Sequence, residues 1–272
     1  MKIHKVTNIE QFVAKIIPKQ AQNNKTIVET IIKNVQKNGD SSVKKYEKKF
    51  TGAAISNLRV SKSEIKNAYS KVSKNEITAL KLSKNKVEKT ESVIKNIFKD
   101  KKINQDGVQI LKKFIPIQST GCYIPGGLAR YPSSVIMSVI PAKVAGVKRI
   151  VVVSPPNSNG KIDPLTIVAA DICGATEIYK TGGVQAIAAL SFGTKSILKV
   201  DKIVGPGGAF VTLAKSSVSD NTGIDMLAGP TELGIIADNS ANPEYIALDL
   251  ISQAEHSSDT FCYLITNSEK TA

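Results

Sequence analysis

Two polar side chains near the carboxyl end of the chain have types and spacing that suit chemistry. Gln253 and His256 lie three residues apart in the segment Ser252-Gln-Ala-Glu-His256. If that segment is helical, both side chains project from one face, one turn apart. An imidazole nitrogen and an amide oxygen so placed can hold a metal ion or a polar substrate. The same pair is also typical of a helix end with solvated side chains, so the spacing alone leaves both interpretations open.

Glycine-rich turns are the second candidate for chemistry. Four of them follow short apolar runs: Ile124-Pro-Gly-Gly127, Thr181-Gly-Gly-Val-Gln185, Gly205-Pro-Gly-Gly208 and Ala228-Gly-Pro-Thr231. Glycine lets a backbone approach a ligand closely, and the start of the next helix favours a phosphate. None is a strict GxGxxG, because Phe210 stands where the third glycine would follow Gly205, and no phosphate-binding GK[ST] follows any turn. The turns predict a nucleotide or anion site in a small-molecule α/β enzyme.

The elements that must position these turns alternate along the chain from Gly121. Strands are expected at 122–124, 149–153, 177–179, 202–204 and 233–237, and helices at 133–145, 164–173, 184–192 and 209–218. The continuous apolar run Val151-Val-Val153 is typical of a strand buried on both faces. This alternation predicts an open parallel sheet with right-handed crossovers, which binds ligands at the carboxyl ends of its strands.

The first part of the chain is expected to be helical. Residues 26–38 carry apolar side chains at helical spacing, and Ser61-Lys-Ser-Glu64 and Ser73-Lys-Asn-Glu76 have the form of capping boxes. The second box predicts a long amphipathic helix that reaches about Phe98. A strand is expected over 108–117, ending or lying at an edge because of Pro116.

Charge divides the chain more clearly than its total shows. The 272 residues carry a net charge of +14, but residues 1–113 hold 26 lysines and arginines against 10 acidic residues, and residues 114–272 hold 11 against 13. The lysines fall on helix-surface positions without interleaved aromatic residues, which favours a solvated face over a nucleic-acid-binding surface. A nucleic-acid binder that uses this basic region remains the weakest of the alternatives.

Three widely spaced cysteines form no CxxC pair, so the sequence indicates neither a disulfide framework nor a cysteine zinc site. No apolar run is long enough to span a membrane, and no signal peptide is evident. We therefore expect a cytoplasmic protein with no membrane partner.

A series of motifs identifies a resemblance to a known family. In order they are Gly121-Cys-Tyr-Ile-Pro-Gly-Gly127, Tyr131-Pro-Ser-Ser-Val135, Gly182-Gly-Val-Gln-Ala-Ile-Ala-Ala-Leu190, Val200-Asp-Lys-Ile-Val-Gly-Pro-Gly207, Ile224-Asp-Met226, Ala228-Gly-Pro-Thr-Glu232 and Ser252-Gln-Ala-Glu-His256. Together they closely resemble histidinol dehydrogenase. The resemblance covers essentially the whole chain and is weaker over the lysine-rich first hundred residues.

The resemblance implies a fold and an activity. The family is a zinc- and NAD-dependent homodimer that oxidises L-histidinol through L-histidinal to L-histidine, the last steps of histidine biosynthesis. The implied fold is α/β: residues 120–227 form a Rossmann-like domain with a parallel sheet. Residues 1–119 supply a helical lead-in and first strand to a first α/β domain, and residues 228–272 return into that domain, which is incomplete.

The resemblance also assigns residues. Tyr123, Gln185 and Gly208 match cofactor-binding positions, and Thr231, Gln253 and His256 match substrate-binding positions. Gln253 and His256 are in addition two of the zinc ligands. Thr231 replaces the family's usual serine and keeps the hydroxyl. Gly208 replaces the usual asparagine, which removes a hydrogen bond worth about 1 kcal/mol, or several-fold in NAD affinity.

The family's sequence continues well past Ala272. The resemblance places its catalytic Glu-His pair, and an aspartate and a histidine that complete the zinc shell, in that continuation, so no catalytic acid or base is expected within residues 1–272. We therefore interpret the chain as an N-terminal portion of the enzyme that is inactive alone. The alternative is a non-catalytic α/β NAD-binding or assembly protein derived from the family.

Overall fold

The computed structural model describes residues 3–16, 22–126, 130–227, 232–255 and 260–272. They divide into two compact units. The large unit runs from Lys25 to Leu227, and the small unit combines Met1–Asn24 with Ala228–Ala272. The grouping of residues 1–119 and 228–272 into one first domain, expected from the resemblance, stays a prediction.

A five-stranded parallel sheet forms the centre of the large unit. Its strands are β3 (Ser119–Tyr123), β4 (Arg149–Ser154), β5 (Glu177–Lys180), β6 (Lys202–Val204) and β7 (Gly223–Ile224). They lie in the order β5-β4-β3-β6-β7, all parallel. All five residues of β3 are buried, and Val151–Val153 are fully buried, as the apolar run predicted. The predicted α/β class with an open parallel sheet is confirmed.

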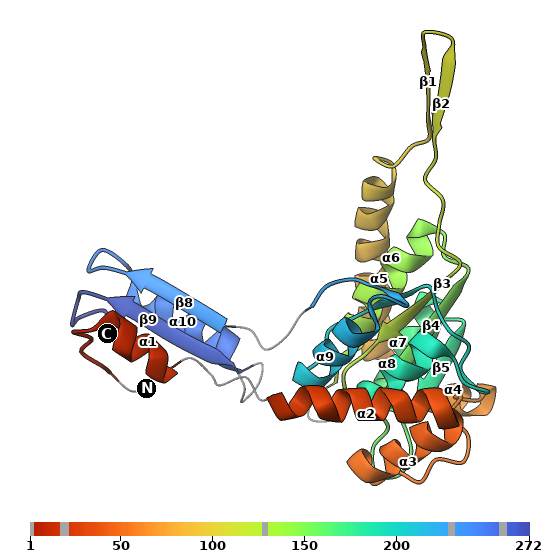
Figure 1. The fold of residues 1–272 in the computed structure, drawn as a ribbon, viewed down its shortest axis with the longest axis horizontal. Coiled ribbons are helices and arrows are strands. Elements are labelled where there is room, and N and C mark those ends of the chain that lie inside the picture. The colour runs from red at the N-terminus through yellow and green to blue at the C-terminus, as the bar shows by residue number, and fades with distance from the viewer. Residues whose placement is uncertain (1–2, 17–21, 127–129, 228–231, 256–259) are drawn as a thin grey trace. The chain divides into compact units, whose positions relative to one another are not determined.

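Helices cover both faces of this sheet (Figure 1). They are α2 (Gln22–Asn38), α3 (Asp40–Thr51), α4 (Lys62–Tyr69), α5 (Lys74–Lys95), α6 (Pro132–Ala145), α7 (Pro164–Cys173), α8 (Gly183–Phe192) and α9 (Ala209–Val218). Val151 and Val153 join one core with α2, α3, α8 and α9, whereas Val152 joins a second core with α4 to α7. The pleat of β4 therefore divides its side chains between two hydrophobic cores.

The helix boundaries follow local chemistry. Both predicted capping boxes are present, since Ser61 and Ser73 accept a hydrogen bond from the backbone of Glu64 and Glu76, and each glutamate binds back to its serine. Asp163 caps α7 by accepting hydrogen bonds from the backbone amides of Leu165 and Thr166. Helix α5 ends at Lys95, three residues before the expected end at Phe98.

A hairpin occupies the segment for which one strand was expected. β1 (Lys101–Gln105) pairs antiparallel with β2 (Val108–Lys112), so the expected strand 108–117 is shorter than predicted. The two-residue turn is Asp106-Gly107, with φ of 49° and 79°, the positive values that a type I′ turn requires. All ten strand residues are exposed, and the hairpin extends away from the sheet and helices of the large unit (Figure 1).

The small unit is built from both ends of the described chain. It contains α1 (Ile9–Ile16), β8 (Glu232–Ala237), α10 (Pro243–Ala254) and β9 (Phe261–Thr266). β8 and β9 pair in parallel over six residues each, with α10 as the crossover. Asn242 caps α10, whose first residue is a proline. Among the described residues, no helix is both long and apolar enough to cross a membrane.

Candidate functional site

The topology of the large unit singles out one edge of its sheet. The chain runs from β3 outward to β4 and β5, and then returns to place β6 on the other side of β3. Such a reversal leaves a crevice outside the carboxyl ends of the two central strands, where open α/β sheets bind ligands. Tyr123 ends β3, and the turn Gly205–Gly208 follows β6. The sheet therefore brings two of the predicted cofactor residues to the same edge, beside this reversal.

The turn after β6 lies directly on the end of β3. A Cβ at Gly205 would be 2.1 Å from the Tyr123 carbonyl oxygen, and Gly205 has a φ of 112°. A Cβ at Gly207 would be 2.3 Å from the Val211 side chain. At Gly208, in contrast, a Cβ would meet nothing within 4 Å. Gly208 is the N-cap of α9 and provides no side-chain cap. The turn thus presents an open backbone surface at the start of a helix, which suits an anionic ligand.

Two further glycine turns at this edge, those after β3 and β5, pack against Pro155. A Cβ at Gly182 would lie 2.5 Å from the Pro155 side chain, and one at Gly126 would lie 2.8 Å from it. Pro155 directly follows β4, the strand between β3 and β5. The turns after β3 and β5 therefore both press against the loop after β4, and only glycine allows that approach.

Tyr123 and Gln185 meet at the turn after β5. The Tyr123 hydroxyl accepts a hydrogen bond from the Gly183 amide at 3.2 Å. Tyr123 is only 5% exposed, and burial raises its pKa to about 12; the nearby charge of Glu47 adds to this, while the Gly183 amide opposes it. Gln185 is 2% exposed and lies in the first turn of α8. The two side chains predicted to contact the cofactor are thus neutral and buried, and Tyr123 binds the backbone two residues before Gln185.

Glu47 is a residue of this site that the sequence did not reveal. One of its oxygens, Oε1, accepts hydrogen bonds from the Thr181 hydroxyl (2.7 Å), the Gly182 amide (2.8 Å) and the Gln185 carboxamide (2.8 Å). Glu47 is fully buried, and burial raises the pKa of its carboxyl despite these three donors. In the lysine-rich segment 40–51 a glutamate is typical of a solvated face. Its position four residues after the buried Val43 was the available signal.

A buried ion pair holds the turn after β6. The Lys215 ammonium donates to the Gly205 carbonyl at 3.0 Å and to the Asp225 carboxylate, whose other oxygen accepts from the Gly205 amide at 2.8 Å. The Lys215 side chain is 3% exposed. Burial pushes the pKa of Asp225 upward, but the bonds from Lys215 and from backbone amides outweigh it and leave the pKa below its ordinary value. Asp225 belongs to the Ile224-Asp-Met226 motif, for which the sequence suggested no role.

The predicted metal and substrate residues belong to the small unit. Gln253 is half-buried near the end of α10, which ends at Ala254 with Glu255 as its C-cap. Thr231 and His256 lie outside the described residues, so the shared helix face of Gln253 and His256 stays a prediction. In the described part of the chain, no three His, Cys, Asp or Glu side chains gather as a metal site would require. A single amide oxygen does not make a zinc site.

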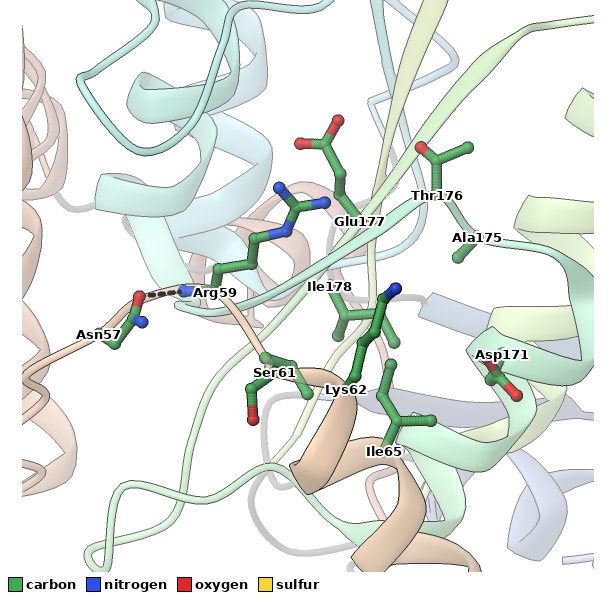
Figure 2. Close-up of a pocket in the computed structure, with 11 residues that line it drawn as sticks. Asn57, Arg59, Ser61, Lys62, Ile65, Asp171, Ala175, Thr176, Glu177 and Ile178 are labelled. Atoms are coloured by element: carbon green, nitrogen blue, oxygen red, sulfur yellow. Dashed lines mark hydrogen bonds between the residues drawn. The ribbon is translucent and has the colours of Figure 1, made fainter.

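A separate hollow of about 730 Å³ lies at the amino end of β5, the edge of the sheet opposite the glycine turns. Figure 2 shows Arg59, Lys62 and Glu177 around it, and the Asn57 carboxamide oxygen accepts from the Arg59 amide at 3.3 Å. None of the predicted site residues lines it. The glycine turns and the large hollow are therefore distinct features of the fold.

Comparison with known proteins agrees with the motifs. The sequence model of the family described as histidinol dehydrogenase matches residues 17–272. Histidinol dehydrogenase of Methanococcus maripaludis is 46% identical over 90% of this chain and 58% of its own length, and that of Methanocaldococcus jannaschii is 44% identical over 100% of this chain and 63% of its own length. The crystal structure of histidinol dehydrogenase from Elizabethkingia anophelis superposes with a TM-score of 0.83 at 40% identity, covering 93% of this chain and 58% of that one. The chain thus spans about three-fifths of the length of these relatives.

Proposed function

The chain belongs to the histidinol dehydrogenase family, and from this we propose that its large unit binds NAD for the oxidation of L-histidinol to L-histidine through L-histidinal. The observation that carries the proposal is the reversal of strand order between β3 and β6, beside which open α/β sheets bind ligands. There the Gly205 turn lies on the Tyr123 carbonyl, and the start of α9 is open at Gly208. A dinucleotide needs such a close backbone approach beside a helix N-terminus.

The residues of this chain would divide the work as follows. Tyr123, Gln185 and the Gly208 turn would hold the cofactor, which supplies the hydride-accepting chemistry when bound. The Tyr123 phenol is neutral and the Gln185 carboxamide does not ionise, and both are buried. They would therefore orient a ligand and exclude water, and would not exchange protons. Thr231, Gln253 and His256 would bind the substrate.

The remaining groups of the reaction follow from the family resemblance. Gln253 and His256 would supply two ligands to a zinc ion that orients the imidazole and amine of histidinol. The catalytic acid/base pair and two further zinc ligands would come from the longer sequence of the family. We propose a cytoplasmic homodimer for the whole protein, with neither nucleic acid nor membrane as partner, and no turnover by residues 1–272 alone.

The test combines binding and turnover. The purified chain is titrated with NAD by calorimetry, and NADH formation is then followed with L-histidinol and zinc. We expect saturable NAD binding without NADH. Absence of NAD binding would refute the cofactor proposal, and NADH formation would refute the proposed inactivity.

A version of the chain extended by its downstream coding sequence distinguishes an enzyme from a non-catalytic NAD-binding protein. Turnover by the extended version supports an enzyme whose remaining groups lie downstream. NAD binding without turnover there would favour the non-catalytic NAD-binding protein.

A further inference from the structure

We infer that Glu47 is the positioning residue of the cofactor site: from α3 it fixes the turn Thr181–Gln185 and makes Gln185 offer its carboxamide oxygen, rather than its NH₂ group, to a dinucleotide. The inference rests on the proposed function, because it names how one predicted cofactor residue is held. It is drawn from the bonds of a single buried oxygen.

The geometry makes Glu47 the centre of this turn. Its Oε1 accepts from Thr181, Gly182 and Gln185, which lie 134 to 138 residues away in sequence. Gly182 is the N-cap of α8 and has no side chain with which to cap the helix. The Glu47 carboxylate therefore supplies from another helix the negative charge that a helix N-terminus favours.

The chemistry of a carboxylate fixes the orientation of Gln185. An ionised carboxylate can only accept hydrogen bonds, so the Gln185 group that faces it at 2.8 Å is the NH₂ donor. The carboxamide oxygen must then face away from Glu47. It lies beside Gly183, where a Cβ would be 3.1 Å from it. Gly183 is also the residue whose amide binds the hydroxyl of Tyr123, the other predicted cofactor contact.

Two buried acceptors at this point have no partner among the described residues: Glu47 Oε2 and Gln185 Oε1. A buried acceptor that finds no donor is destabilising, and such groups are uncommon in folded proteins. NAD carries donors of the required kind, namely ribose hydroxyls and a carboxamide NH₂. The free oxygen of Gln185 is therefore suited to receive a donor from the cofactor.

A purely structural role explains Glu47 poorly. In the part of the chain that the structure describes, no Lys, Arg or His forms an ion pair with it, and it is fully buried. A buried carboxylate without a cation is commonly less stabilising than an apolar side chain of similar size. The carboxylate also fixes the orientation of the turn, because one of its oxygens accepts hydrogen bonds from three donors of that turn.

The experiment compares the 272-residue chain with three variants by NAD calorimetry. Glu47→Ala removes the acceptor, and we expect its NAD dissociation constant to rise by about tenfold or more. Glu47→Gln keeps one acceptor oxygen and should recover affinity to within about threefold of wild type. Val43→Ala is the matched control, because Val43 is a fully buried residue of the same helix that makes no contact with the turn through hydrogen bonds. It should lower thermal stability and leave NAD affinity unchanged.

A second readout needs no cofactor. In nitrogen-15 spectra, Glu47→Ala should shift the Gln185 side-chain NH₂ signals and speed hydrogen exchange at Gly182, whereas Val43→Ala should do neither. If Glu47→Ala does not fold, Glu47→Asp withdraws the oxygen while keeping the charge, and the same changes are expected.

Each outcome is decisive. Unchanged Gln185 and Gly182 signals, or NAD affinity in Glu47→Ala within twofold of wild type, would overturn the role of Glu47. A wild-type chain that does not bind NAD would instead refute the proposed function, and the spectra would still decide whether Glu47 fixes the turn.

Discussion

Replacing Gly205 by alanine should damage the fold far more than replacing Gly208, three residues later in the same turn. At Gly205 the added Cβ would lie 2.1 Å from the Tyr123 carbonyl oxygen, on a backbone with a φ of 112°. The backbone conformation alone costs about 1–2 kcal/mol for an L-residue. Relief of the clash also requires the turn to move away from β3, which lengthens the bonds of Gly205 to Asp225 and Lys215. Hydrogen bonds to charged groups are worth about 1.5–3 kcal/mol each.

We therefore expect Gly205→Ala to lower the free energy of unfolding by about 3 kcal/mol or more. Gly208→Ala should lower it by less than about 1 kcal/mol, because a Cβ there meets nothing and only a preferred N-cap residue is lost. Urea denaturation followed by circular dichroism measures both variants, with the denaturant slope as a check that the same transition is compared. Equal losses for the two variants would refute the argument that the turn is built on the end of β3.

Three further predictions concern the charged groups and the cap of this edge. Lys215→Met should destabilise the chain by about 3 kcal/mol, because it leaves the Asp225 carboxylate without its cation, and the double variant with Asp225→Asn should recover much of that loss in urea denaturation. Gly208→Asn should tighten NAD binding several-fold in calorimetry, because it restores an amide at an open position; weaker binding would contradict the assigned contact. Burial raises the pKa of Glu47 above its ordinary 4.5. The contribution of this carboxyl to the free energy of unfolding is therefore full below pH 4.5 and is lost as pH rises through the raised pKa. The side chain in Glu47→Gln cannot ionise. The melting temperature of the wild type should therefore fall relative to that of Glu47→Gln as pH rises above 4.5, and a relative increase would contradict the raised pKa.

The main elements of the large unit were predictable because their signals are local. The continuous apolar strand at Val151–Val153 and the two capping boxes appear in the structure as the sequence indicated. The helices 164–173 and 209–218 match α7 and α9 in full. Where proline, aspartate or glycine fixes the end of a helix, that end can be predicted from the sequence.

Other features depend on contacts between distant residues. The sequence predicts one strand where the hairpin lies, because β1 has a single apolar residue, Ile103, among lysines and amides, and its pairing depends on the Asp106-Gly107 turn. Glu47 has only its spacing from Val43 to distinguish it from the surface glutamates, because its hydrogen-bond partners lie more than a hundred residues away. The same holds for Lys215, which is buried only because Asp225 returns to it.

The division of the chain into units has a consequence for folding during synthesis. The large unit is one continuous stretch, Lys25–Leu227, so its sheet and both of its cores can form as soon as that stretch has left the ribosome. The small unit joins Met1–Asn24 to Ala228–Ala272, and its two strands pair only when β9, near the end of this chain, has been made. Residues 1–24 must therefore wait for residues 228–272 before they can pack, and Gln253 reaches its folded setting after the sheet of the large unit is complete.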